Sequence, residues 1–286
     1  HEFALSRLCP PEAVRPVLGA RLVDGLPALI CADVGARPLP TVVAGTSLEE
    51  RLGLAIAITR ALAAVHRIGV THGDLAPDNV LVTEAGAALL VDLELATLAP
   101  RRAPEAAHPA ELPATLATIA PESTGRLRRY SDRRADLYSL GATLFELFAG
   151  TPPFPDADRL TLVRSHIARD APSLLERDAA APAALAETLA RLLAKRPENR
   201  PQEASILVAE LEGIAAGIRS GRPTAATGHA SRPSPPRFCA PTEFLGRSAA
   251  RQVLQDAMRD AAAGSSDFVL LSGESGIGKS TLARSL

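Results

Sequence analysis

The sequence of 286 residues contains no tryptophan, only two tyrosines and only seven phenylalanines. Proteins that bind single-stranded nucleic acid stack the bases on aromatic side chains, so this scarcity argues against such a surface. The net charge of −1 provides no general attraction to nucleic acid or to an anionic membrane. We therefore expect a protein without a nucleic-acid partner.

Cysteines and long apolar runs are also scarce. The three cysteines, Cys9, Cys31 and Cys239, are too scattered to form a disulfide framework or a metal-ligand pair. Such cysteine usage is typical of the reducing cytosol. The most apolar stretch, residues 52–65, is interrupted by Arg60 and is shorter than the roughly 20 residues that a membrane-spanning helix needs. We therefore expect a cytoplasmic protein with no membrane span.

Composition divides the chain into three parts. Hydrophobic residues make up 47% of the sequence, which is enough for a packed core. Residues 221–241 are rich in Pro, Ser, Thr, Ala and Gly, a composition typical of an extended linker. Apolar periodic segments lie on both sides of it. The sequence therefore predicts a first domain over 1–216, a linker over 217–243 and a second domain over 244–286.

The first region begins as a mixture of helix and strand and ends as helices. Ser47 can cap a helix that continues to Arg67, with Glu50 completing a capping box. Two short strands, 80–82 and 87–91, flank a turn. This order predicts an α+β domain. Further helices are expected over 132–149, 156–169, 183–194 and 203–216.

The densest group of polar residues is the run His-Gly-Asp-Leu-Ala-Pro-Asp-Asn, from His72 to Asn79, followed by Asp92. Asn79 and Asp92 stand at the open ends of the predicted strand pair, and paired strands lie about 4.7–4.9 Å apart. Asp74 is in the loop just upstream. Oxygen ligands of this kind suit Mg²⁺ bound to substrate phosphates. Each residue alone could be an ordinary turn residue, but the spacing of the set predicts a phosphoryl-transfer site.

This run resembles the catalytic loop of protein kinases, with Asp92-Leu93-Glu94 in place of Asp-Phe-Gly. Residues 114–122 resemble the segment that ends the activation loop of these enzymes. Residues 136–141 resemble a motif of the central helix in their C-lobe. The resemblance covers roughly residues 1–214 and implies a protein-kinase-like fold.

The resemblance also implies roles for individual residues. ATP would be the phosphoryl donor, Asp74 would orient the acceptor hydroxyl, and Asn79 and Asp92 would hold Mg²⁺. In the family, a glutamate and an arginine at the positions of Glu122 and Arg200 form a structural ion pair. Structural roles are implied for His72, Thr115, Glu122, Asp136 and Arg200.

The beginning of the chain matches the kinase pattern only in part. Glu2 resembles the helix glutamate that pairs with the ATP-binding lysine, and we assign it to ATP binding. The glycine-rich loop and the lysine strand would precede His1, and Leu286 falls within a predicted helix. We therefore expect a fragment of a longer protein, with an incomplete N-lobe and a mostly helical C-lobe.

Three substitutions in the site depart from the kinase pattern. Gly73 stands where these enzymes have an arginine, Ala76 where they have a lysine that contacts the transferred phosphate, and Glu94 where they have a glycine. These departures leave open a weakly active kinase, or a pseudokinase that regulates other modules. The His-Gly-Asp-Leu run also occurs in aminoglycoside and choline phosphotransferases, although the landmarks after residue 114 favour a protein kinase.

A second nucleotide site is predicted near the end of the chain. The run Gly-Glu-Ser-Gly-Ile-Gly-Lys-Ser, residues 273–280, fits the P-loop pattern between an apolar strand and a helix. Its glycines let backbone N–H groups surround the phosphates, Lys279 would reach the β- and γ-phosphates, and Ser280 would join the Mg²⁺ shell. We assign to nucleotide binding Gly273, Gly276, Gly278, Lys279, Ser280 and Thr281.

The order of these parts resembles bacterial signalling proteins in which a serine/threonine kinase precedes an AAA-type ATPase. Some of these proteins continue into GAF and histidine-kinase modules. The sequence therefore predicts a kinase-like α+β domain followed by the beginning of an α/β P-loop domain. The expected partners are ATP, Mg²⁺, and either a protein substrate or signalling modules of the same polypeptide.

Overall fold

The computed structural model describes residues 2–98, 101–102, 115–127, 130–220, 252–253, 256–257 and 259. The chain divides into two compact units, His1–Ser234 and Pro235–Leu286. Among the described residues, no helix is both long enough and apolar enough to cross a membrane. The first unit contains all the elements that follow.

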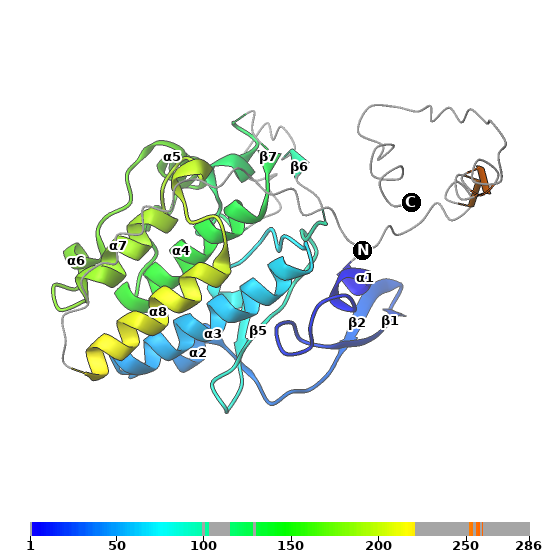
Figure 1. The fold of residues 1–286 in the computed structure, drawn as a ribbon, viewed down its shortest axis with the longest axis horizontal. Helices are drawn as coiled ribbons and strands as arrows, with labels where there is room; N and C mark the ends of the chain where they lie inside the picture. Colours follow the sequence, from blue (N-terminus) through cyan, green and yellow to red (C-terminus); the bar gives the residue numbers. More distant parts are fainter. Residues whose placement is uncertain are drawn as a thin grey trace. The chain divides into compact units, whose positions relative to one another are not determined.

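An antiparallel hairpin of β1 (Val17–Val23) and β2 (Leu26–Cys31) lies beside the short helix α1 (Glu2–Ser6) (Figure 1). The two residues of its turn, Asp24 and Gly25, have positive φ angles of 51° and 79°. Such a turn matches the twist of hairpin strands, and Asp-Gly is a preferred sequence for it. Local turn chemistry therefore sets the register of this hairpin.

A second sheet has the order β3-β4-β5 and is antiparallel throughout. Its strands are β3 (Arg37–Pro38), β4 (Val80–Val82) and β5 (Ala88–Leu90). Val80 pairs with Leu90, and every side chain of β4 and β5 is buried. The two predicted strands are therefore confirmed, with β5 one residue shorter at each end.

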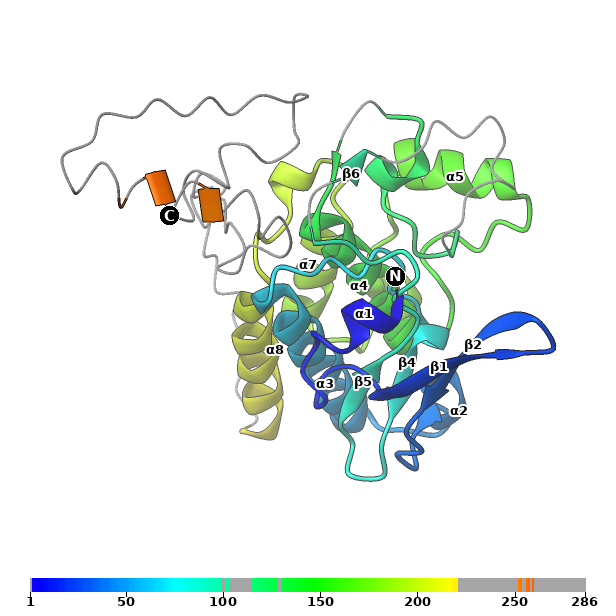
Figure 2. The same ribbon diagram turned by 90° about the vertical axis from the view of Figure 1, so that its right-hand side faces the viewer.

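Helix α3 (Leu48–Arg67) packs against β5 and lies alongside α8 (Ala204–Arg219), as Figure 2 shows. The Ser47 hydroxyl accepts a hydrogen bond from the Glu50 N–H, and the Glu50 carboxylate accepts one from the Ser47 N–H at 2.7 Å. The predicted capping box is therefore confirmed, and it satisfies two N–H groups that the helix itself leaves unpaired.

Helix α4 (Arg133–Ala149) is the centre of the helical lobe and is buried along most of its length. A helix that is apolar on nearly all sides belongs in a protein interior, and α3 and α7 contact it from different directions. The first unit also contains the helices α2 (Leu39–Val42), α5 (Arg159–Ala168), α6 (Leu174–Arg177) and α7 (Ala183–Leu192).

The predicted α+β class and all four of the later predicted helices are confirmed. Helix α8 continues to Arg219, and the predicted domain boundaries stay predictions. Helix α6 was not predicted, because a single turn is too short to show helical periodicity. Its capping box, formed by Ser173 and Glu176, was the available signal.

Gly141 allows α4 and α7 to approach each other closely. A Cβ atom at this position would lie 2.7 Å from the Cβ of Leu192. We predict that Gly141→Ala lowers the unfolding free energy by about 1–3 kcal/mol, because the added methyl group has no room. Gly213 on α8 has open space around it, so Gly213→Ala should raise the unfolding free energy by about 0.5–1 kcal/mol. Urea denaturation measures both changes, and effects of the same sign would contradict this packing.

Candidate functional site

A buried carboxylate on α4 holds the loop that carries the predicted catalytic residue. Asp136 is 1% exposed, and its two oxygens accept hydrogen bonds from the main-chain N–H groups of His72 at 2.7 Å and Gly73 at 2.8 Å. His66 Nε2 lies 2.8 Å from the same carboxylate. Burial acts to raise the pKa of Asp136, but these hydrogen bonds outweigh it and hold the pKa below its usual value. The loop is therefore anchored to an anion.

Asp74 follows this anchor and is held by Thr115 from a distant part of the sequence. The Thr115 N–H donates to Asp74 Oδ1 at 2.7 Å, and the Thr115 hydroxyl donates to Oδ2 at 3.2 Å. Burial raises the pKa of the Asp74 carboxyl, although the bonds from Thr115 act in the opposite direction. A carboxylate with a raised pKa accepts a proton more readily, which suits a general base.

The strand pair brings Asn79 beside the residue that precedes Asp92. The Val91 N–H donates to the Asn79 carbonyl oxygen at 3.0 Å, so the β4–β5 pairing continues past the strand ends. The Asn79 side-chain nitrogen donates to the main-chain oxygen of Asp74 at 2.9 Å. Its amide oxygen is therefore the atom left to act as a ligand. The three predicted site residues Asp74, Asn79 and Asp92 thus come from one continuous piece of local structure.

Asp92 itself has an unusual backbone. Its φ angle is 63°, in the left-handed region that Asp tolerates better than most residues, and it is exposed. The next residue, Leu93, is buried and donates its N–H to Glu2 Oε1 at 3.2 Å. Glu2 from α1 therefore contacts the segment that carries Asp92. Asn79 is half-buried and Asp92 is exposed, and carboxylate and amide oxygens are the hard ligands that a magnesium ion prefers.

His72 is fully buried, and its contacts define its tautomer. Its Nε2 lies 3.1 Å from the Val91 carbonyl oxygen, which can only accept, so Nε2 carries the proton. Its Nδ1 then accepts a hydrogen bond from the Asp74 N–H at 3.3 Å. Burial lowers the pKa of His72, which agrees with a neutral ring. His72 therefore links the Asp92 segment to Asp74 without contributing charge.

Gly73 lies where the loop that carries Asp74 approaches the segment after Asp92. Its φ angle is 85°, and a Cβ atom there would lie only 2.6 Å from the carbonyl oxygen of Leu95. A glycine accommodates both the left-handed backbone and this approach. The replacement of arginine at this position therefore has a steric reason in this chain.

Glu122 and Arg200 are brought together from positions 78 residues apart. Two parallel hydrogen bonds of 2.6 and 2.9 Å join them, and both side chains are at most 1% exposed. Arg200 also donates to the main-chain carbonyls of Arg134, Ala194 and Lys195. This pair joins the segment after Thr115 to the loop between α7 and α8.

We predict that removing either member of this pair is strongly destabilising. Glu122→Leu leaves an unpaired buried guanidinium, at a cost of about 3–5 kcal/mol in unfolding free energy. Arg200→Met should cost at least as much, because it also removes hydrogen bonds to three carbonyls. The double variant should lose less than the sum of the two. A double-mutant cycle measured by chemical denaturation checks this, and simple additivity would contradict the coupling.

Tyr138, Phe154 and His166 form an aromatic cluster, and Phe154 packs with Leu116 and Ile119 of the segment after Thr115. Tyr138 Oη and His166 Nδ1 are 3.0 Å apart, and the His166 ring packs edge-on against Phe154. Lys195 Nζ lies 4.6 Å from the centre of the Phe154 ring. Burial lowers the pKa of His166 to about 4, and the charge of Lys195 contributes in the same direction.

The stability of the domain should therefore depend on pH through His166. Its folded pKa of about 4 lies below the ordinary value of 6.5, so the unfolded chain binds more protons between these values. This contribution to stability is complete above pH 6.5 and is lost as the pH falls. From pH 7 to pH 5, we expect the wild type to lose about 2 kcal/mol more than His166→Gln. Denaturation curves at both pH values test this, and parallel losses would contradict it.

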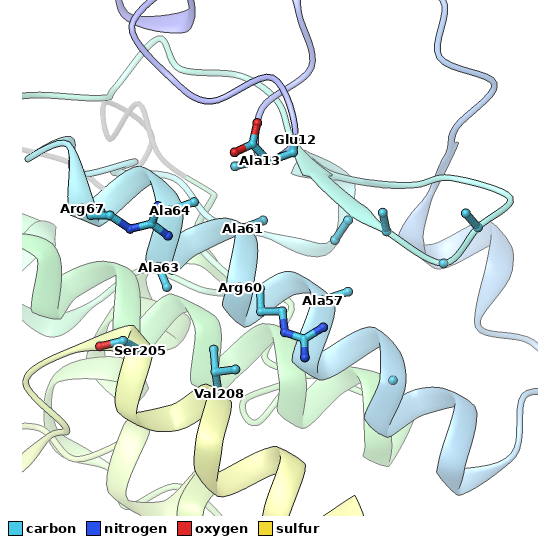
Figure 3. Close-up of a pocket in the computed structure, with 15 residues that line it drawn as sticks. Glu12, Ala13, Ala57, Arg60, Ala61, Ala63, Ala64, Arg67, Ser205 and Val208 are labelled. Atoms are coloured by element: carbon cyan, nitrogen blue, oxygen red, sulfur yellow. The ribbon is translucent and has the colours of Figure 1, made fainter.

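A groove of about 670 Å³ lies on the exposed side of α3 (Figure 3). Its walls include alanines of α3 and the turn between β4 and β5, with Arg60 and Arg67 on α3. The groove is not lined by Asp74, Asn79 or Asp92. It is therefore distinct from the candidate phosphoryl-transfer site.

One residue of the site was not predicted, and several predicted site residues lie outside the described chain. His66 carries no motif signal, because its partner Asp136 is 70 positions away. The predicted P-loop residues of the second domain lie outside the described residues, namely Gly273, Gly276, Gly278, Lys279, Ser280 and Thr281.

Comparisons with known proteins match both parts of the chain. Residues 44–210 match the protein kinase domain, and residues 243–286 match the AAA ATPase domain. The DNA damage-responsive serine/threonine-protein kinase RqkA of Deinococcus radiodurans is 33% identical over 202 residues, which are 69% of this chain and 28% of that protein. Serine/threonine-protein kinase Pkn1 of Myxococcus xanthus is 35% identical over 190 residues, 65% of this chain and 26% of that protein. The chain spans less than a third of either relative.

Geometry and comparisons agree on the class, a domain with a protein-kinase-like fold. The chain belongs to the protein kinase domain family, whose matched residues cover more than half of its length. Its relatives include bacterial serine/threonine kinases, and AAA ATPase sequence follows the kinase domain. The predicted order of the two domains is therefore confirmed.

Proposed function

We propose that this protein transfers the γ-phosphate of ATP to serine or threonine hydroxyls of a protein substrate. The observation that carries the proposal is the Asp136 anchor, because it fixes the loop in which Asp74 stands beside Asn79. Family membership supports ATP as the donor. The relatives described as serine/threonine kinases support a hydroxyl of a protein as the acceptor.

In this proposal each residue acts on a separate part of the reaction. Asp74 accepts the proton of the acceptor hydroxyl, and its raised pKa favours that transfer. Asn79 and Asp92 would hold Mg²⁺, and Glu2 braces the Asp92 segment through Leu93. Bound Mg²⁺ would neutralise charge on the phosphates. In the second domain, Lys279 and Ser280 would bind a separate nucleotide.

A catalytically weak pseudokinase is the second candidate, and two site residues favour it. Ala76 is buried and offers no cation to the transferred phosphate, and Glu94 adds a carboxylate two residues after Asp92. Both substitutions make the site more negative, which opposes the binding of phosphate. Under this candidate the domain binds nucleotide and regulates neighbouring modules without transfer.

Asp74→Asn in the full-length protein tests the proposal. The amide preserves the shape of the side chain but cannot accept the proton, so we expect the rate of phosphate transfer to fall by about 10²–10⁴-fold. The matched control is Asp24→Asn in the β1–β2 turn, where Asn-Gly is equally suitable, and it should retain full activity. Transfer of ³²P from ATP to casein measures both variants.

The same assay separates the candidates. Transfer by the wild type that disappears in Asp74→Asn supports the kinase. Undiminished transfer by Asp74→Asn would contradict the role of Asp74. Nucleotide binding by the wild type without transfer to any protein would favour the pseudokinase.

A further inference from the structure

The groove beside α3 is lined mainly by small residues, which leave room for a partner to approach closely. Of the 15 residues that line it, eight are alanines and two are glycines. Four of these small residues follow one face of α3, namely Gly53, Ala57, Ala61 and Ala64. Because an α-helix rises about 1.5 Å per residue, this stripe is roughly 16 Å long. The floor of the groove is therefore elongated and suits a segment of polypeptide.

Gly53 is not explained by the packing of the domain itself. It lies within the 20-residue helix α3 and is exposed, and a Cβ atom at its position would have nothing within 4 Å. A glycine inside a helix is unfavourable because its backbone loses more freedom on folding than that of any other residue. The domain thus carries an unfavourable helix residue on the floor of the groove, where the missing side chain leaves space for a partner.

Two cations follow one edge of this floor. Helical periodicity places Arg60 and Arg67 together along the edge of α3 that faces α8, because Arg60 pairs with Glu212 of α8. The side chains of that pair are 62% and 45% exposed, so the pair contributes little to stability and can be exchanged. Arg67 is exposed and has no ion pair within the described ranges of the chain. This edge therefore offers positive charge to a partner.

The spacing of the two arginines fits a second helix. They are seven residues apart, which is about 10.5 Å along α3. A helix that lies along α3 presents side chains at the same interval when they are also seven residues apart. Glu12, which lines the groove from the segment before β1, would repel carboxylates on the other edge. Acidic residues of the partner therefore belong along a single edge.

We propose that this groove is a docking site for an amphipathic, acidic helix of another protein. The helix would place small residues on the floor of the groove and two carboxylates, seven residues apart, against Arg60 and Arg67. The groove is not lined by the candidate phosphoryl-transfer residues, so this docking does not depend on phosphate transfer.

The linker sequence of the same chain does not match the groove. Residues 221–243 contain three arginines and one glutamate, together with five prolines. Prolines interrupt a helix, and the arginines would be repelled by Arg60 and Arg67. Charge complementarity therefore favours a separate, acidic partner.

The test measures binding of a synthetic peptide to the full-length protein by fluorescence anisotropy. The probe is a fluorescein-labelled, alanine-rich peptide of about 18 residues, long enough to form a helix, with two glutamates seven positions apart. Its control carries lysines at the same two positions. We expect the glutamate peptide to bind and the lysine peptide not to bind, and we expect added salt to weaken the binding.

Four variants locate the binding. Gly53→Leu fills the floor of the groove and should weaken binding by more than about tenfold, and Arg67→Glu should weaken it by about two- to tenfold. The matched controls are Gly213→Leu on α8 and Arg164→Glu on α5, at an open glycine and an exposed arginine that do not line the groove. Both controls should bind like the wild type. Gly53→Leu should not lower the melting temperature, because the added Cβ atom meets nothing within 4 Å.

Several outcomes would overturn the proposal. These are no saturable binding of the glutamate peptide by the wild type up to about 1 mM, undiminished binding by Gly53→Leu and Arg67→Glu, or equal binding of the lysine peptide. Self-association of the wild type in analytical ultracentrifugation that Gly53→Leu abolishes would make a second copy of the chain the occupant instead. Displacement of the probe by a peptide of residues 221–243 would make the linker the occupant.

Discussion

The buried carboxylate of Asp136 is the constraint on which the rest of the site depends. An ionised group in a protein interior is costly unless hydrogen bonds satisfy it, and Asp136 is satisfied by the amides of His72 and Gly73 and by the ring of His66. The central helix, α3 and the catalytic loop therefore hold one another. Because Asp74 follows directly on this anchor, its position is set by the buried centre of the helical lobe.

Gly73 shows how the chain departs from the kinase pattern without losing this arrangement. Where an arginine would add a cation, the glycine lets the carbonyl of Leu95 pack against the loop at a distance that no Cβ would allow. The other two departures are of a different kind, since Ala76 is buried and Glu94 is exposed. None of the three prevents the loop from forming. The question they raise about activity is therefore electrostatic, and the fold is not what limits it.

Features written in local sequence could be predicted, and features made by distant contacts could not. The capping box of Ser47 and Glu50 and the two strands around residue 84 are local patterns, and they are found where the sequence indicated. The Asp24-Gly25 turn of the first hairpin is a local signal too, but strand β1 was not predicted. The role of His66 could not be predicted, because it depends on Asp136, which is 70 positions away on α4. The hydrogen bonds from Thr115 to Asp74 could not be predicted for the same reason, although the resemblance to protein kinases had implied a role for each residue.

The charge around Asp74 is the electrostatic condition that any bound nucleotide has to meet. Burial is the main reason that the pKa of Asp74 is raised, and the nearby charge of Asp92 adds to it. The hydrogen-bond partners of the Asp74 side chain in the described chain, Thr115 and Asn79, are neutral. Among the described residues, the negative charge of Asp74 is therefore not offset by an ion pair. A divalent cation bound with nucleotide would relieve this charge. Under the proposed function, bound Mg²⁺ would therefore act both on the phosphates and on the charge shared by Asp74 and Asp92.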